Sequence, residues 1–446
     1  MADGTAIAAR AVTAIPSAGS ALPTHKVTEL DSGLRIATEA MPSVRSAALG
    51  FFVGAGSRGE AVEEAGLSHF LEHLLFKGTD KYPSVEIDRL FDGWGAELNA
   101  GTDKESTTVY ARMLDEHLPR AFDVMADMIW RPSFQDVDPE REVVLEEIAM
   151  YEDDPQDSVF DVLGHAVFGS HPLGRSIIGT APVIADTPVD RIAAFHAARY
   201  VPSSVVIAAA GHVDHDAIVE LATATFGDLE RAGSGPPVEA APARPPATIR
   251  FQAKDTEQVH ICLGATGLPR TDERRFALRV LDAIFGGLSS SRLFQAIREE
   301  RGLAYSVFSF TGQFQDSGQI GLYVGTRPDN LAEAMEIVGI ELERMRREPA
   351  TAEELTRAKT NVKARVILAL ESTGARMNRL GGALLFGMPV LEPDELMAKI
   401  DAVKMDDLHA LAEELWVPAR LSAAGIGPDE DAFHSAVAGV CEGATA

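Results

Sequence analysis

The sequence predicts an α+β fold in which two homologous domains, each a sheet covered by helices, occupy one chain. Its 446 residues exceed what one ordinary hydrophobic core serves, and 46% of them are apolar. A segment rich in Pro, Gly and Ala at 231–248 (RAGSGPPVEAAPARPPAT) has no apolar periodicity and is typical of a semi-rigid linker. The sequences on its two sides follow the same order of segments. We therefore expect an N-terminal domain at 25–230 and a C-terminal domain at 249–446, related by internal duplication.

Both halves begin with strand-like sequence and end with an apolar run. The opening segments are GLRIATE and SAALGFFVGAGS in the first half, and TIRFQA and QVHICLGATG in the second. A short RLF segment precedes further strand-like sequence in each, at 88–91 and at 291–294. The late runs SSVVIAAAG (203–211) and ARLSAAGIG (419–427) predict buried strands that return to the opening sheets. Helical sequence fills the intervals and is expected to cover those sheets.

The composition excludes several classes of function. The net charge is −27, from 67 acidic and 40 basic residues, whereas nucleic-acid binders carry a basic surface. The acidic balance is compatible with basic peptide ligands. The two cysteines, Cys262 and Cys441, are too few for a disulfide framework or a thiolate zinc site. No apolar run approaches the roughly 18 residues that span a bilayer, so we expect no membrane segment.

The first 24 residues are rich in Ala, Ser and Thr. Asp3 stands where a secretory signal would carry positive charge, and no continuous apolar stretch follows. A mitochondrial transit peptide would contain more Arg and no acid. We therefore predict a flexible tail at 1–24 and a cytoplasmic protein.

The segment SHFLEHLLFKGT at 68–79 places two histidines four residues apart. On a helix, His69 and His73 project from one face, so both can bind one ion at about 2.0–2.1 Å. Glu72 borders that face, where a carboxylate can accept a proton from metal-activated water. A bare H-x-x-E-H arises by chance in roughly 3 of 100 such chains, and a histidine pair that merely packs is the alternative. The hypothesis therefore needs a third ligand.

The candidate third ligand lies in the segment VDPEREVVLEEIAMYEDDP at 137–155, which predicts a helix that runs to about Tyr151. Asp138 is a favourable N-cap for this helix. Glu140 and Glu147 are seven residues apart and share a face, while Glu146 points elsewhere. Considered alone, this pattern is more often a solvated acidic face, because charge runs on helices usually face water. Combined with the histidines, it favours a hydrolytic zinc site with an open fourth position.

Five segments together resemble one family over nearly the whole chain. That family comprises pitrilysin, insulin-degrading enzyme and mitochondrial processing peptidase, the zinc peptidases with the inverted HxxEH motif. The resembling segments are GSRGEAVEEAGLSHFLEHLLFKGT, ELNAGTDKESTTVYARM, PEREVVLEEIAMYEDDP, HPLGRSIIGT and FGGLSSSRLFQAIREERGLAYSV.

The resemblance implies a role for each residue of the metal site. His69, His73 and Glu147 match the zinc ligands, and Glu72 matches the general base and acid. Glu140 matches a residue that supports the site by holding a ligand in place.

The resemblance also implies residues that contact substrate. Asn99 and Ala100 match the edge strand that pairs with an extended peptide, which requires free backbone N–H and C=O groups. Arg298 and Tyr305 match a pair that reaches the substrate from the opposite half, and both are suitable donors to an oxyanion. Taken alone, a surface ion pair for Arg298 and core packing for Tyr305 are the simpler interpretations.

The resulting hypothesis is a zinc-dependent endopeptidase that hydrolyses unfolded peptides bound in extended form in an enclosed chamber. One chain is expected to supply half of a clamshell chamber, which predicts a homodimer, with a heterodimer with a related subunit as the alternative. Two other classes of function remain open. The chain could be a non-catalytic structural subunit, or a peptide-binding partner that works only beside a different subunit.

Overall fold

The computed structural model describes residues 25–227, 229, 233, 235–348 and 350–445. The predicted tail at 1–24 and part of the predicted linker lie outside these residues. The chain forms two compact units. Unit 1 takes the residues up to Ile148 together with Ile177–Val238 and Ile367–Glu392, and unit 2 takes the remainder.

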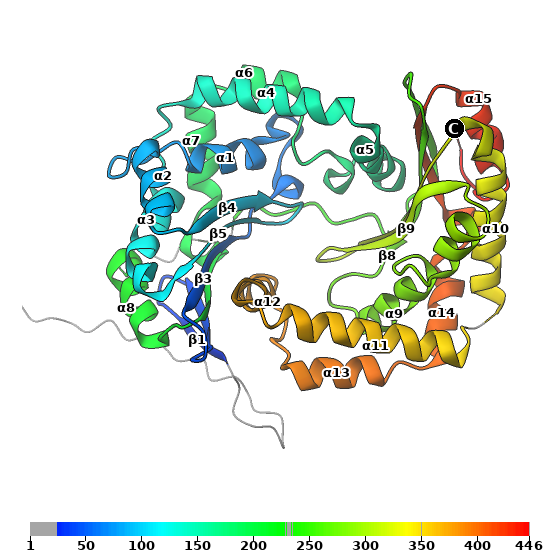
Figure 1. Cartoon of the computed structure of the whole chain (residues 1–446). Coiled ribbons are helices and arrows are strands. Elements are labelled where there is room, and N and C mark those ends of the chain that lie inside the picture. The colour runs from blue at the N-terminus through cyan, green and yellow to red at the C-terminus, as the bar shows by residue number, and fades with distance from the viewer. Residues whose placement is uncertain (1–24, 228, 230–232, 234, 349, 446) are drawn as a thin grey trace, which may run out of the picture. The chain divides into compact units, whose positions relative to one another are not determined.

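Unit 1 is built on a six-stranded sheet of order β1-β2-β6-β3-β5-β4 (Figure 1). Strands β2 and β6 are parallel, and the other neighbours are antiparallel. Every residue of β6 is buried, which confirms the predicted return of this apolar run to the opening sheet. The strands are β1 (His25–Glu29), β2 (Arg35–Ala40), β3 (Ser46–Val53), β4 (Glu97–Thr102), β5 (Thr107–Leu114) and β6 (Val205–Gly211).

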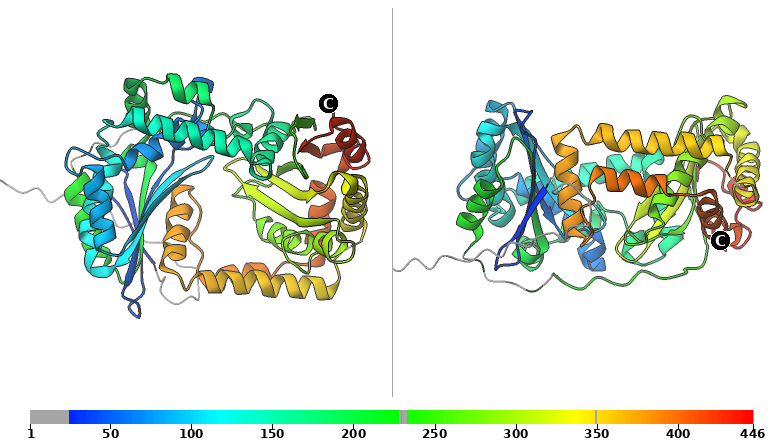
Figure 2. Two further views of the ribbon diagram at one scale, coloured as in Figure 1. Left: turned by 45° about the horizontal axis from the view of Figure 1, so that its top comes forward. Right: turned by 90° about the horizontal axis from the view of Figure 1, so that it is seen from below.

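Successive side chains of a strand point to opposite faces of the sheet. In unit 1, different helices cover these two faces. Phe51 of β3 packs into the core beneath the helices, with its ring centroid 5.6 Å from that of Phe122 and 6.2 Å from that of Trp130. Phe52 points to the other face, where it packs with Met377 and Leu380 of α12. Figure 2 shows α12 against this face of the sheet. The helices of unit 1 are α1 (Leu67–Leu75), α2 (Ser84–Gly93), α3 (Leu118–Trp130), α4 (Val137–Asp153, as far as Ile148), α6 (Ala181–Asp186), α7 (Val189–Arg199), α8 (His215–Phe226) and α12 (Thr373–Leu385).

Unit 2 repeats this plan with a five-stranded sheet of order β7-β11-β8-β10-β9. Strands β7 and β11 are parallel, and the rest are antiparallel, as in the corresponding part of unit 1. The shared order confirms the duplicated α+β fold. The strands are β7 (Ile249–Ala253), β8 (Val259–Gly267), β9 (Ala304–Gln313), β10 (Gly318–Thr326) and β11 (Ser422–Gly427). The helices are α5 (Pro155–Phe168), α9 (Arg275–Phe285), α10 (Leu331–Arg347), α11 (Ala352–Ala369, as far as Val366), α13 (Pro393–Asp401), α14 (Met405–Leu415) and α15 (Glu430–Val437), with a π-helical turn at Phe294–Glu299.

Each unit includes one helix from the other half of the sequence. Helix α5 precedes the linker but packs on β8 and β11 of unit 2, with Phe160 against Phe308, Phe310 and Tyr323. Helix α12 lies in the C-terminal half but packs on β3 and β6 of unit 1. The division at 231–248 and the spatial units therefore differ, because each sheet has a second apolar face that needs a covering helix.

An ion pair helps to hold α12 on unit 1. The carboxylate of Glu39 in β2 is 1% exposed and accepts hydrogen bonds from Arg376 and Arg379 of α12. The Arg379 Nη2 to Glu39 Oε2 distance is 2.6 Å. A buried carboxylate is tolerated here because two guanidinium groups compensate its charge.

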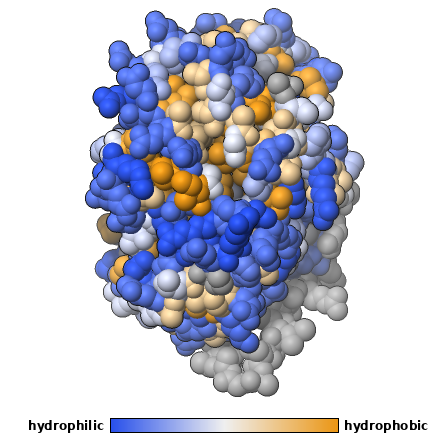
Figure 3. Space-filling view, turned by 90° about the vertical axis from the view of Figure 1, so that its right-hand side faces the viewer, coloured by the Kyte–Doolittle hydropathy of each residue, from blue (hydrophilic) through white to orange (hydrophobic). Residues whose placement is uncertain are grey.

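The side of unit 2 that carries α10 and α15 has a cavity of about 1070 Å³ between these two helices. Figure 3 views this side, where hydrophilic side chains surround smaller apolar patches. None of the cavity's lining residues is a predicted site residue. Within the described part of the chain, no helix combines the length and apolar character needed to cross a bilayer.

Candidate metal centre

Helix α1 buries an apolar stripe and leaves three polar side chains on another side. It starts after Gly66, whose φ of 98° favours glycine. His69, Glu72 and His73 face α4 and the end of β4, as their contacts below show. The apolar residues that anchor the helix in the core of unit 1 are each at most 1% exposed: Leu67, Phe70, Leu71, Leu74 and Leu75.

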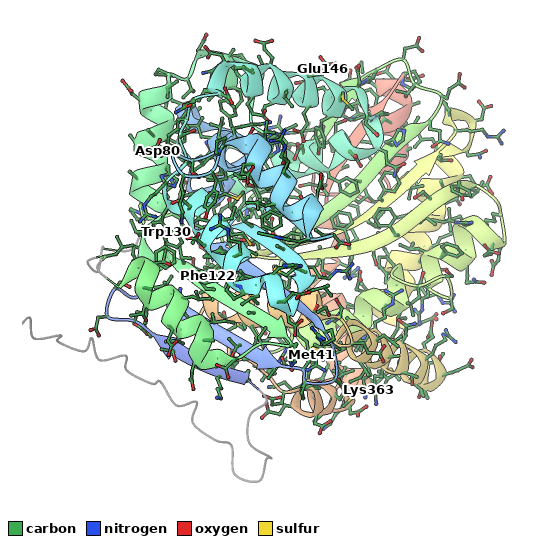
Figure 4. All side chains as sticks on the ribbon, turned by 60° about the vertical axis from the view of Figure 1, so that its left-hand side comes forward. Met41, Asp80, Phe122, Trp130, Glu146 and Lys363 are labelled. Atoms are coloured by element: carbon green, nitrogen blue, oxygen red, sulfur yellow. The ribbon has the colours of Figure 1, made fainter. Side chains whose placement is uncertain are left out.

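Helix α4 presents two glutamates to α1. Val144, which lies between them along the helix, is fully buried, so this face of α4 is directed inward. Glu140 and Glu147 share the face, at i and i+7. Glu146 is exposed and extends from the outer side of α4 (Figure 4). The acidic helix therefore does not simply face solvent.

The structure brings the three predicted ligands together. His69 Nε2 and His73 Nε2 are 3.3 Å apart. Glu147 Oε1 lies 3.6 Å from His69 Nε2, and Glu147 Oε2 lies 3.3 Å from His73 Nε2. Ligand atoms around a tetrahedral zinc at 2.0–2.1 Å are separated by about 3.3 Å, so this donor set fits zinc. Among the described residues, it is the one group of three or more His, Cys, Asp and Glu side chains that could hold a metal ion.

Glu140 orients one of the two imidazoles. Its Oε1 lies 2.8 Å from His73 Nδ1, and its Oε2 lies 2.6 Å from Lys77 Nζ. Because a carboxylate can only accept, the proton of His73 is on Nδ1, which leaves the Nε2 lone pair directed at the ligand cluster. Lys77, which follows the end of α1, was not predicted.

His69 differs from His73 in its surroundings. Its side chain is 10% exposed, and burial together with the nearby His73 lowers the pKa of His69 to about 4. At neutral pH the imidazole is therefore uncharged, which is the form that binds a metal. Unlike His73, it has no hydrogen-bond partner for Nδ1 among the described residues. Orientation of His69 depends instead on the packing of α1.

The side chain of Glu72 extends from α1 to the last residue of β4. Its Oε2 accepts a hydrogen bond of 2.6 Å from the hydroxyl of Thr102. Burial raises the pKa of Glu72, and the Thr102 hydrogen bond and His73 act in the opposite direction. A carboxylate with a raised pKa next to a metal site is suited to accept and return a proton. Thr102 was not predicted. Period-2 alternation along β4, which puts it on the side of Leu98 and Ala100, is the signal that could have indicated it.

Asn99 and Ala100 lie on β4, the outermost strand of the sheet next to β5. The Ala100 N–H donates to Asn99 Oδ1 at 2.8 Å, so it is directed away from β5. The open sheet edge that the resemblance implied is therefore present. The side chain of Asn99, on the same strand, accepts the hydrogen bond of one N–H group of this edge. An incoming peptide strand can replace that side-chain contact.

Arg298 and Tyr305 lie together in unit 2. The Arg298 guanidinium stacks over the Tyr305 ring at 4.5 Å from its centroid, and Nη1 donates to the Tyr305 carbonyl at 3.0 Å. Tyr305 is 78% exposed, which excludes the core-packing alternative. Arg298 also lies 3.7 Å from Glu299, so the surface ion pair considered for it is present. The predicted residues thus form two clusters, the metal residues with β4 in unit 1 and this pair in unit 2.

Two family models match most of the chain. "Insulinase (Peptidase family M16)" matches residues 35–181, and "Peptidase M16 inactive domain" matches residues 188–362. An uncharacterized zinc protease of Streptomyces coelicolor is 43% identical over 430 residues, covering 93% of each chain. An uncharacterized zinc protease of Bacillus subtilis is 40% identical over 388 residues, covering 86% of this chain and 94% of that protein.

Solved structures show the same fold. The crystal structure of a protease from Helicobacter pylori has a TM-score of 0.86 at 24% identity, covering 91% of this chain and 100% of that one. The peptidase M16 inactive domain from Pseudomonas fluorescens has a TM-score of 0.82 at 21% identity, with coverage of 91% and 98%. The resemblance found in the sequence is therefore confirmed, and the chain belongs to the M16, or insulinase, family of peptidases.

Proposed function

We propose that this protein is a zinc-dependent endopeptidase that hydrolyses peptides bound in extended form. The observation that carries the proposal is the convergence of two imidazole nitrogens and one carboxylate, with their ligand atoms within 4.8 Å of one another. The names of its relatives as zinc proteases support the same assignment. A group of this composition with an open fourth position is suited to hydrolysis.

His69, His73 and Glu147 would hold zinc, which would supply a Lewis acid that polarises a carbonyl and acidifies water. Glu72 takes the proton of the attacking water and delivers it to the leaving amine. Thr102 holds the Glu72 carboxylate through its hydroxyl, so the base needs little reorganisation to act.

The substrate binds as an additional strand along β4. Backbone groups at Asn99 and Ala100 pair with the peptide, which requires the peptide to be unfolded there. Arg298 and Tyr305 donate hydrogen bonds to the carbonyl oxygen as it gains negative charge. We propose that an enclosed chamber limits the size of the substrate.

The test is the peptidase activity of the purified chain on quenched peptides, with and without a chelator. We expect activity that the chelator abolishes and added zinc restores, and that Glu72→Gln removes while zinc remains bound. A purified chain that binds zinc but cleaves no peptide would contradict the proposal. It would favour the alternative, a non-catalytic or partner subunit of a hetero-oligomer.

We further propose a cytoplasmic homodimer in which each metal site is completed by the partner's C-terminal half. Mixing Glu72→Gln chains with Arg298→Ala/Tyr305→Ala chains tests this arrangement. Activity restored in the mixture supports sharing between subunits. Confirmed mixed dimers without restored activity would contradict it.

A further inference from the structure

The N-terminus of α1 lacks a capping side chain of its own. Gly66 occupies the N-cap position and carries no side chain, while the first N–H groups of any helix have no partner within the helix. Gly66 is also tightly packed, because a Cβ atom there would lie 2.6 Å from the Ile178 carbonyl oxygen. The start of the helix that carries the histidines therefore depends on neighbouring segments.

Glu60, six residues earlier, supplies the missing cap. Its Oε2 accepts the Gly66 N–H at 2.8 Å, and its Oε1 accepts the Ser68 N–H at 2.7 Å. The residue is 5% exposed, so these are buried, charge-assisted hydrogen bonds. A carboxylate at this end of a helix also interacts favourably with the helix dipole. Both oxygens are used, and both act on the turn immediately before His69.

The segment that carries Glu60 is itself fastened to the hairpin of β4 and β5. The Ser57 N–H donates to the Asp103 carbonyl at 3.2 Å, and the Arg58 N–H donates to the Lys104 carbonyl at 2.7 Å. The buried Arg58 side chain adds an ion pair of 2.7 Å with Glu105. The segment thus connects the start of α1 to the turn that directly follows Thr102 of β4.

A second buried charge compensates the Glu60 carboxylate. Arg199 of α7 donates to the Gly59 carbonyl and to Glu64 Oε2, both at 2.9 Å. Burial lowers the pKa of Arg199, and the nearby charges of Glu64 and Glu60 act in the opposite direction. The positive charge of Arg199 helps to explain why the Glu60 carboxylate is tolerated in the interior. The two hydrogen bonds to α1 depend on where the Glu60 carboxylate lies.

We propose that Glu60 is a positioning residue of the metal centre: by capping α1 it fixes the imidazole pair relative to α4 and Glu72 relative to β4. The inference rests on the proposed zinc site and adds a residue that contacts neither the ion nor the substrate. A cap that acted only on stability would lower the melting temperature without changing zinc affinity. A positioning cap changes the zinc affinity of the folded protein as well, since ligands that are no longer held in place bind more weakly.

The experiment compares Glu60→Gln with Asp214→Asn in the full-length chain. Gln keeps the shape of Glu but offers one acceptor for two N–H groups. Asp214 caps α8 of the same unit through the Ala217 N–H at 2.9 Å, so its loss is a matched defect away from the site. Zinc affinity is measured by competition with a chromogenic chelator, and folding is followed by circular dichroism. We expect roughly 10–100-fold weaker zinc binding for Glu60→Gln and unchanged binding for Asp214→Asn.

Glu60→Asp covers the case in which Glu60→Gln does not fold. It retains the charge beside Arg199, but the shorter side chain reaches only one N–H group, so zinc binding should weaken less than in Glu60→Gln. Unchanged zinc affinity in a folded Glu60 variant, or an equal loss in Asp214→Asn, would overturn the inference while leaving the zinc site intact. A wild-type chain that binds no zinc would instead overturn the proposed function and this inference with it.

Discussion

Helices α1 and α9 occupy equivalent places in the duplicated fold. Helix α1 lies between β3 and β4 along the chain, and α9 lies between β8 and β9. Both bury an apolar face under their own sheet. Helix α1 uses its remaining side for two histidines and a glutamate, whereas α9 contains no histidine. Its half-buried acid, Asp282, accepts a hydrogen bond of 2.6 Å from Ser309 of β9.

The helices that follow differ in the same way. Helix α4 directs Glu140 and Glu147 to α1. Helix α11 carries Lys359 and Lys363, whose amino groups contact Asp401 at the end of α13. The comparison teaches that the shared architecture supplies only the position of a site. A few polar residues on two helices decide whether that position holds a metal or becomes ordinary packing.

Replacing the half-buried acid in each helix gives the largest expected contrast in activity. Glu72→Gln should lower kcat by about 10²–10⁴-fold, because the proton acceptor is lost. Zinc content should stay near that of the wild type, because Glu72 is not a ligand. Asp282→Asn in α9 should leave peptidase activity close to wild type. Activity on a quenched peptide and zinc by mass spectrometry are the measurements, and equal activity losses in the two variants would remove the distinction between the helices.

Within α4, the inward-facing Glu140 and the exposed Glu146 should behave differently when replaced. Glu140→Gln should weaken zinc binding by roughly 10–100-fold, because His73 loses the partner that orients it. Glu146→Gln is the matched control on the exposed side and should bind zinc as the wild type does. Chelator competition measures both. If the two variants bind zinc alike, the inward face of α4 has no role in the site.

A smaller effect is expected at the end of β4. Thr102→Val removes the hydroxyl that donates to Glu72 and leaves the side-chain volume nearly unchanged. The lost charge-assisted hydrogen bond, about 1.5 kcal/mol, corresponds to a kcat about tenfold lower. Zinc content should not change. Thr108→Val on β5 serves as the control. Steady-state kinetics measures kcat for both variants, and equal kcat values would contradict the prediction.

A substitution in unit 2 should change the free energy of unfolding rather than the peptidase activity. Glu354 at the start of α11 accepts hydrogen bonds from Arg292 at 2.8 and 2.9 Å, and this ion pair lowers the pKa of Glu354 to about 2. Since the pKa is lower in the folded state, the stabilisation is present above the ordinary value of 4.5 and is lost as the pH falls towards 2. Glu354→Gln should lose about 1.5–3 kcal/mol at pH 7.

Thermal unfolding of wild type and Glu354→Gln at several pH values measures this effect. The difference in melting temperature should be largest at neutral pH and should shrink between pH 4.5 and 2. A difference that stays constant over this range would show that the charge of Glu354 does not contribute.

Local patterns in the sequence predicted many of these strands and site residues. The apolar runs became β6 and β11, and the i, i+4 and i, i+7 spacings put the predicted side chains on inward faces of α1 and α4. What they could not reveal depends on contacts between distant segments. Thr102 meets Glu72 across 30 residues. The exchange of α5 and α12 between units depends on which sheet face lacks cover, and helix amphipathicity alone does not specify the partner sheet.

Anomalous diffraction at the zinc absorption edge, on crystals of the wild-type chain, tests the central claim most directly. The account predicts one peak about 2.0–2.2 Å from His69 Nε2, His73 Nε2 and a carboxylate oxygen of Glu147. Zinc-saturated crystals with no peak at these residues, or with Glu147 turned away from the imidazoles, would contradict it.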